Sequence, residues 1–152
     1  MALDQAGIGI RAALDEARRA AALDEVPIGA VVTRAGEIVA RAHNETVARK
    51  NPTHHAEFLA IERALAALET DRLTDCTLYV TLEPCAQCAG AIVLAKVGKL
   101  VFGAYDEKAG MCGSVGDLVR HPRLNHRVDV RGGVEAEACG ELIREFFAAR
   151  RA

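Results

Sequence analysis

The stretch Thr77-Leu78-Tyr79-Val80-Thr81-Leu82-Glu83-Pro84-Cys85-Ala86-Gln87-Cys88 decides the fold, because a strand pattern passes directly into a helix pattern. Residues 77–82 are β-branched and apolar, which is typical of a central strand. Pro84 favours the first turn of a helix, and we expect this helix to run through about Lys96, before the stop signal Gly98. Three of its apolar residues should face inward: Ile92, Val93 and Val97.

Strand and helix patterns alternate on both sides of this stretch. Further strands are predicted at residues 28–33, 37–41, 100–104 and 127–130, with the turn Ala35-Gly36 joining the first two as a hairpin. Further helices are predicted at residues 4–25, 53–69 and 134–150. Residues 106–116 hold three glycines and no periodicity, which indicates a loop. This alternation predicts an α/β fold with three α/β/α layers, in which helices cover both faces of one sheet.

Apolar residues at helical spacing predict which faces of two helices are buried. In the helix at residues 53–69 the expected core stripe is Phe58, Ile61, Leu65 and Leu68. In the last helix the expected anchors are Leu142, Ile143, Phe146 and Phe147. Because Phe146 and Phe147 are adjacent, we expect one ring to pack inward and the other to be exposed.

Length, charge and cysteine content restrict the class of protein. The chain has 152 residues, which fits one domain over residues 1–152, and its net charge of −2 neither indicates nor excludes a nucleic-acid partner. Met1-Ala2-Leu3-Asp4 lacks the pattern of a secretory signal, and no apolar run approaches the ~20 residues that span a bilayer. Five cysteines, two of them in a Cys-x-x-Cys pair, do not fit a disulfide framework. We therefore expect a cytoplasmic protein without a membrane segment.

Two short motifs carry the chemistry: His55-Ala56-Glu57 and Pro84-Cys85-Ala86-Gln87-Cys88. Cys85 and Cys88 are three residues apart at a predicted helix start, so both thiols project from one face of its first turn. The partial positive charge of a helix N-terminus lowers the pKa of a thiol and favours the thiolate. Two thiolates and the imidazole of His55 form a ligand set that Zn²⁺ prefers, which predicts one zinc ion per chain.

The number of ligands favours a catalytic zinc site over a structural one. Structural sites are usually closed by four protein ligands, whereas catalytic sites leave one position for water, and only His55, Cys85 and Cys88 are in evidence here. Glu57 stands two residues after His55 and can lie beside the metal-bound water without binding the metal. Its carboxylate can then carry the proton that the water loses.

Other interpretations exist for each motif taken alone. A histidine at a helix start is more often a packing or capping residue, and a Cys-x-x-Cys pair can be redox-active or half of a four-cysteine zinc ribbon. Its position after a strand does not by itself exclude a redox pair. The remaining cysteines, however, form no second pair: Cys76, Cys112 and Cys139. The joint presence of both motifs favours catalytic zinc, and the His-Ala-Glu spacing assigns the ligand to His55 and not to His54.

His-x-Glu followed by Pro-Cys-x-x-Cys is the known signature of the cytidine deaminase-like superfamily. Over nearly its whole length the chain resembles one branch, the bacterial tRNA-specific adenosine deaminases. The matching stretches are residues 25–31, Asn44, residues 52–57, 78–85, 101–104 and 125–128, and the tail from Phe146-Phe147 to Arg150-Arg151. The resemblance implies a five-stranded mixed sheet, a homodimer, and hydrolytic conversion of adenosine to inosine at the wobble position of a tRNA anticodon.

The resemblance also implies roles for individual residues. Glu57 would shuttle the proton while zinc-bound hydroxide attacks C6, and the turn Glu83-Pro84-Cys85 would supply backbone donors around the water. Asn44 would hydrogen-bond the target nucleotide. Two groups would contact the rest of the anticodon stem-loop: Asp106 and Asn125 at the flanking nucleotides, and Phe147, Arg150 and Arg151 at the loop.

Several of these residues also have simpler interpretations. Asn44 follows a strand and can cap a turn, and Arg150-Arg151 can be a solvated helix end, although four more arginines make the C-terminal part basic: Arg120, Arg123, Arg127 and Arg131. Three positions depart from what is expected of the family: His54, Gln87 and Cys112. The rival functions are a free-base or nucleoside deaminase for cytosine, cytidine or guanine, and a non-catalytic zinc-stabilised module that binds nucleic acid. Intact Glu57 counts against the latter.

Overall fold

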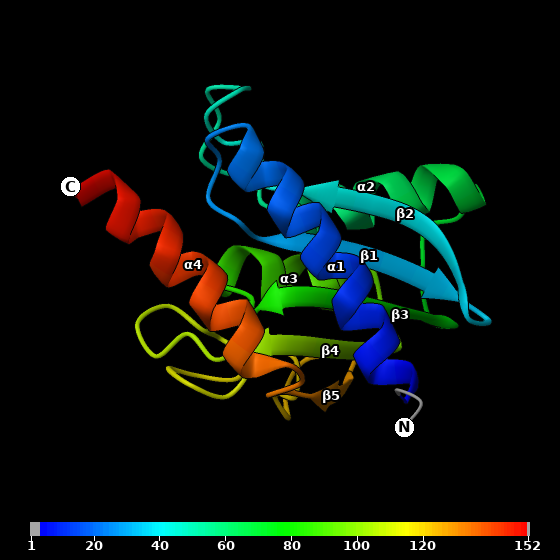
Figure 1. Cartoon of the computed structure of the whole chain (residues 1–152). Helices are drawn as coiled ribbons and strands as arrows, with labels where there is room; N and C mark the ends of the chain where they lie inside the picture. The colour runs from blue at the N-terminus through cyan, green and yellow to red at the C-terminus, as the bar shows by residue number, and fades with distance from the viewer. Residues whose placement is uncertain (1–3, 152) are drawn as a thin grey trace.

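The computed structural model describes residues 4–151, so the predicted domain ends at residues 1 and 152 lie outside the described residues. The elements in chain order are α1 (Gln5–Ala22), β1 (Gly29–Arg34), β2 (Glu37–His43), α2 (Ala56–Leu68), β3 (Cys76–Leu82), α3 (Ala86–Leu94), β4 (Lys99–Ala104), β5 (Asp129–Arg131) and α4 (Ala136–Arg151). The strands form one five-stranded sheet in the order β2-β1-β3-β4-β5 (Figure 1). β1 is antiparallel to β2 and β3, whereas β3, β4 and β5 are parallel, so the predicted mixed sheet is confirmed.

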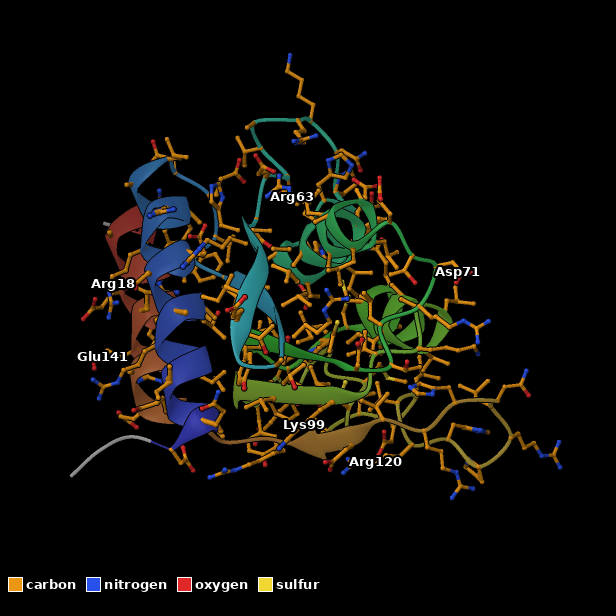
Figure 2. All side chains as sticks on the ribbon, turned by 90° about the vertical axis from the view of Figure 1, so that its right-hand side faces the viewer. Arg18, Arg63, Asp71, Lys99, Arg120 and Glu141 are labelled. Atoms are coloured by element: carbon orange, nitrogen blue, oxygen red, sulfur yellow. The ribbon has the colours of Figure 1, made fainter. Side chains whose placement is uncertain are left out.

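Helices cover both faces of this sheet, which confirms the three predicted layers. Successive side chains of a strand point to opposite faces. Leu78 and Val80 of β3 therefore join the core beneath α2 and α3, whereas Tyr79 between them joins the core beneath α1 and α4. Figure 2 shows the sheet between these two helix pairs. None of the helices within residues 4–151 is long and apolar enough to cross a membrane.

Two glycines, Gly9 in α1 and Gly29 in β1, let α1 lie close to the sheet. A Cβ atom at Gly9 would lie 2.2 Å from the Tyr79 ring, and one at Gly29 would lie 2.0 Å from the carbonyl oxygen of Ala13. The loss of helix propensity at Gly9 is offset by the close packing that this residue permits.

The predicted core stripe of α2 is partly wrong. Ile61 is buried, but Phe58, Leu65 and Leu68 are only half-buried. The most buried positions are instead Ala56, Leu59, Ala60 and Ala64. Alanines on this side allow the helix to approach the sheet, so the largest apolar residues do not mark the side that packs closest.

Candidate active site

A pocket of about 390 Å³ opens where β3 and β4 end and where α2 and α3 begin. It is lined by five of the predicted site residues: Asn44, His55, Glu57, Cys85 and Asp106. These positions are far apart in the sequence, and the sheet brings them together because parallel strands end at the same edge. Ligand sites in open α/β sheets lie at this carboxyl edge of the strands.

His55, Cys85 and Cys88 form one cluster whose geometry fits zinc. His55 is the N-cap of α2, Cys85 is the N-cap of α3, and Cys88 follows one turn later. The Nδ1 atom of His55 lies 3.6 Å from Cys85 Sγ and 3.5 Å from Cys88 Sγ, and all three ligand atoms lie within 4.8 Å of one another. Tetrahedral zinc with Zn–S of about 2.3 Å and Zn–N of about 2.0–2.1 Å separates N and S by about 3.6 Å. The three side chains therefore fit a tetrahedral zinc ion that keeps a fourth position.

The electrostatics of the cluster favour a thiolate. Hydrogen bonds from Cys88 and His55 lower the pKa of Cys85 to about 3. The same interaction with Cys85 raises the pKa of His55 above its usual value. Because the thiolate is the form that binds metal, the site already holds an anionic ligand at neutral pH.

Glu57 is the second residue of α2 and lies in the pocket beside the cluster, with only 4% of its surface exposed. Burial raises the pKa of Glu57 to about 7, against the attraction of His55, which lowers it. A carboxyl group with this pKa can both accept and donate a proton near neutral pH.

Asn44 caps α2 and also lines the pocket. Its Oδ1 atom accepts a hydrogen bond of 2.9 Å from the backbone N–H of Ala56, the first residue of α2. The N-cap His55 makes no side-chain capping bond, so Asn44 supplies the cap from outside the helix and leaves the imidazole ring free. Asn44 also lines the pocket, where its Nδ2 amide makes no hydrogen bond within residues 4–151.

Glu83 anchors one wall of the pocket, a role that the sequence did not reveal. Its buried carboxylate accepts hydrogen bonds from the backbone N–H groups of Asp106, Cys112 and Ser114 at 3.0–3.1 Å, and from the Ser114 hydroxyl. A Cβ atom at Gly110 would lie 2.3 Å from the same carboxylate. One side chain therefore fixes a loop of about ten residues with almost no secondary structure. An acidic residue between a buried strand and a proline was the only signal for it in the sequence.

Glu25 anchors a second wall of the pocket, the loop between β2 and α2. Its carboxylate is 1% exposed and accepts hydrogen bonds from the backbone N–H groups of Val47 at 3.0 Å and Ala48 at 2.7 Å. This holds the segment between β2 and α2 that leads to His55. Two buried carboxylates thus shape both loops of the pocket.

Replacing Glu83 by glutamine is expected to destabilise the protein by about 1–3 kcal/mol at pH 7, because an amide cannot accept from all of these donors. Burial raises the pKa of Glu83, but the hydrogen bonds from Ser114, Asp106 and Cys112 together hold it below its usual value. The carboxylate therefore stabilises the fold fully above about pH 4.3, the usual pKa of glutamate, and this contribution is lost as the pH falls through the lower folded-state pKa.

Urea unfolding at pH 7 and at pH 3 tests this expectation. The difference between wild type and Glu83→Gln should be large at pH 7 and smaller at pH 3. Glu107→Gln, an exposed change in the same loop, should have little effect at either pH. Equal unfolding midpoints for wild type and Glu83→Gln at pH 7 would contradict the anchoring role.

A second concavity of about 580 Å³ continues from the pocket along α4. Three residues line both: Val26, Leu82 and Asp106. The second concavity is lined further by the exposed rings of Tyr105 and Phe147 and by the cations Lys108 and Arg144. Phe147 is 42% exposed while Phe146 is buried, which confirms the predicted division between these two rings.

Three further predicted substrate contacts, Asp106, Arg150 and Arg151, differ in whether their charged groups are already engaged within the protein. Oδ1 of Asp106 accepts from the backbone N–H groups of Lys108 and Ala109 at 3.1 Å, which leaves its second oxygen for a ligand. Arg151 is exposed at the end of α4. Arg150 instead donates to Asp24 at 2.6 Å and lies 3.3 Å from the centre of the Phe146 ring. A contact between Arg150 and tRNA would require this ion pair to open.

Asn125 is not brought to the pocket. The ring of its neighbour His126 hydrogen-bonds to the carbonyl oxygen of Val97 at 2.7 Å, just before β4 begins at Lys99. The pocket lies beyond the other end of this strand, about 20 Å away at ~3.3 Å per residue. Figure 2 faces the end of the sheet where Lys99 lies, opposite the pocket.

The chain is similar to known deaminases in sequence. A family model for MafB19-like deaminases matches residues 7–151. The tRNA-specific adenosine deaminase of Bacillus subtilis is 49% identical over 138 residues, which cover 91% of this chain and 86% of the relative. The enzyme of the same name from Aquifex aeolicus is 46% identical over 138 residues, 91% of either chain.

Solved structures agree. One from a study of A-to-I editing by tRNA:A34 deaminases at the wobble position is 41% identical, with a TM-score of 0.85, covering 89% of this chain and 98% of that chain. A guanine deaminase from Nitrosomonas europaea is 25% identical, with a TM-score of 0.82, covering 97% of this chain and 86% of that chain. Fold and site together define an enzyme with the cytidine deaminase-like fold. The chain belongs to the family of tRNA-specific adenosine deaminases, as its sequence predicted.

Proposed function

We propose that this enzyme hydrolyses adenosine to inosine at the wobble position of a tRNA anticodon, in a zinc-dependent reaction that releases ammonia. The observation that carries the proposal is the cluster of His55, Cys85 and Cys88 beside Glu57, in a pocket that continues into a concavity lined by aromatic and cationic side chains. A free base would need the first pocket only, whereas a nucleotide within an RNA loop has neighbours that need the second.

His55, Cys85 and Cys88 would hold one zinc ion per chain. When bound, zinc would lower the pKa of a water molecule from ~15.7 towards 7. The N-cap Cys85 makes no side-chain capping bond, so the first backbone N–H groups of α3 remain available as donors around that water.

Glu57 would move the protons. Its carboxylate would accept one from the attacking water and deliver it to the purine ring as C6 becomes tetrahedral. The second proton of the water would leave with the amino group as ammonia, which completes the exchange of an amino group for oxygen. A pKa of about 7 suits a group that must act as base and then as acid.

The rest of the pocket would orient the target nucleotide. The Nδ2 amide of Asn44 would donate to it, while Oδ1 remains bound to Ala56. Asp106 stands where the two concavities meet and would contact a flanking nucleotide. Phe147 would stack on a base of the anticodon loop, and Arg151 would contact its phosphates. Unstacked loop bases are what proteins read in RNA through such contacts.

Incubation of the purified, zinc-loaded protein with an arginine tRNA transcript that carries adenosine at the wobble position tests the proposal. Inosine is read as guanosine on sequencing, so an A-to-G change at that position alone is expected. The likeness to a guanine deaminase makes a free-base substrate the second candidate. No conversion of the tRNA, with guanine or cytosine consumed instead, would overturn the proposal in favour of that candidate. Binding of tRNA without turnover of any substrate would favour a non-catalytic module.

Phe147→Ala is expected to raise the KM for tRNA by about tenfold, since base–aromatic stacking contributes ~1–3 kcal/mol per base. The kcat should change less, because the ring lies away from the metal cluster. Ile8→Ala removes an exposed apolar side chain from α1, outside both concavities, and should leave both constants unchanged. A Phe147→Ala enzyme with wild-type KM would remove this residue from the substrate site.

We also propose that the enzyme is a cytoplasmic homodimer, as its family resemblance implies. Leu94 at the end of α3 is 82% exposed, next to the small residues Gly90 and Ala91, and this apolar surface would pack against a second copy. Light scattering should give twice the 16.2 kDa of one chain. Leu94→Glu should give monomers, whereas Ile38→Glu on the edge strand β2 should not. A wild-type monomer at micromolar concentration would contradict the dimer.

A further inference from the structure

Gln87 lies between the two cysteines, and its side chain connects the segments that carry the proposed zinc ligands. The Nε2 atom donates a hydrogen bond of 2.8 Å to the carbonyl oxygen of Thr53 and lies 3.7 Å from Cys88 Sγ. Thr53 precedes the ligand His55 by two residues. A primary amide has two N–H groups, so it can donate to the carbonyl and to the sulfur at the same time.

The Gln87–Thr53 bond differs from the other hydrogen bonds between the two ligand segments, because it involves no ligand atom. Within the described part of the chain, three side-chain hydrogen bonds join residues 51–55 to residues 85–88. Two of them use ligand atoms of His55, Cys85 and Cys88, which a bound metal would occupy. Only the Gln87–Thr53 bond can persist unchanged in the metal-loaded protein.

The backbone of His55 is tied to the same carbonyl group, because its N–H donates a hydrogen bond of 2.9 Å to the carbonyl oxygen of Thr53. The Thr53 carbonyl therefore accepts from both the Gln87 side chain and the backbone of the ligand residue His55.

We propose that Gln87 is a positioning residue for the metal: it fastens the His55 segment to α3 and donates to the Cys88 sulfur, and so strengthens zinc binding. The inference rests on the proposed zinc dependence of the enzyme. An N–H donor stabilises a thiolate, and a fixed distance between the segments removes the need to order them when metal binds. Outer residues of this kind contribute about 10–100-fold in metal affinity.

Gln87→Met tests the proposal, because methionine matches the length of glutamine and its helix propensity but has no donor. Zinc affinity is measured by competition with a chromophoric chelator. The cobalt-loaded protein gives a second readout in its sulfur-to-metal charge-transfer absorption. Gln87→Met is expected to bind zinc about 10–100-fold more weakly, with a shifted charge-transfer band. Gln5→Met, at the other glutamine of the chain, should match wild type in both.

The outcomes separate the two proposals. Wild-type zinc affinity and an unchanged cobalt spectrum in Gln87→Met would overturn the role of Gln87 and leave the zinc-dependent function intact. Failure of the wild-type protein to bind zinc would overturn both. Gln87→Lys restores a donor and is expected to recover part of the affinity; recovery by Gln87→Leu instead would show that packing matters and not donation, and would also overturn the proposal.

Discussion

Glu57→Gln is expected to lower the rate of adenosine deamination by at least about 10³-fold while the zinc content stays at one per chain. General acid–base catalysis by a positioned side chain contributes ~10²–10⁴-fold, and Glu57 would serve more than one proton transfer in each cycle. Glutamine keeps the shape of the buried side chain and removes its ability to accept a proton. Because Glu57 is not among the three clustered ligands, metal binding should survive.

Single-turnover kinetics with saturating enzyme measure the chemical step and avoid effects on tRNA binding. The matched control is Glu62→Gln, an exposed glutamate on the same helix, which should retain wild-type turnover. A Glu57→Gln enzyme with turnover within tenfold of wild type would assign proton transfer to another group. Loss of zinc from this variant would instead make Glu57 part of the metal site.

Cys85→Ser is expected to abolish both zinc binding and turnover. The pKa of Cys85 is lowered to about 3, so its thiolate is the anionic ligand in place at neutral pH, whereas a serine hydroxyl stays protonated and is a poor zinc ligand. The variant would keep one imidazole and one thiol, too few to retain the ion in competition with a chelator. The fold should persist, because Cys85 is half-exposed and outside the main core.

Metal analysis after dialysis against a weak chelator provides the measurement. Wild type should retain about one zinc per chain and Cys85→Ser about none. Cys76→Ser changes a buried cysteine at the start of β3, away from the cluster, and should retain zinc despite some loss of stability. Active Cys85→Ser protein without zinc would overturn the proposed mechanism.

The parts of the fold and site that could be predicted are those encoded locally. The strand at residues 77–82 and the helix after Pro84 follow from neighbouring residues, and the ligand cluster follows from two short spacings whose chemistry is specific. The prediction of which side of α2 is buried was partly wrong. Ala60 and Ala64 give a weak hydrophobic signal in the sequence, yet both are fully buried against the sheet.

The roles of Glu25 and Glu83 depend on where distant loops return. A sequence pattern gives no measure of which N–H groups lack partners until the chain has folded, and so it could not reveal these anchors. The same limit applies to Asn125, which local sequence places in a family motif but which the parallel β4–β5 pairing puts at the far end of the sheet. The capping of α2 by Asn44 likewise joins two segments 12 residues apart through a single backbone N–H group.

The anchoring by Glu83 has a consequence for how substrate preference can change. The carboxylate holds residues 106–114 mainly through main-chain N–H groups, which every residue except proline possesses. Outward side chains such as Tyr105, Glu107 and Lys108 can therefore be exchanged while the loop keeps its path, as long as Gly110 and Ser114 remain. The backbone of the loop is fixed by Glu83, whereas its exposed side chains are free to vary. Libraries that vary these three positions should therefore yield folded enzymes with new sequence preferences far more often than libraries that vary Glu83.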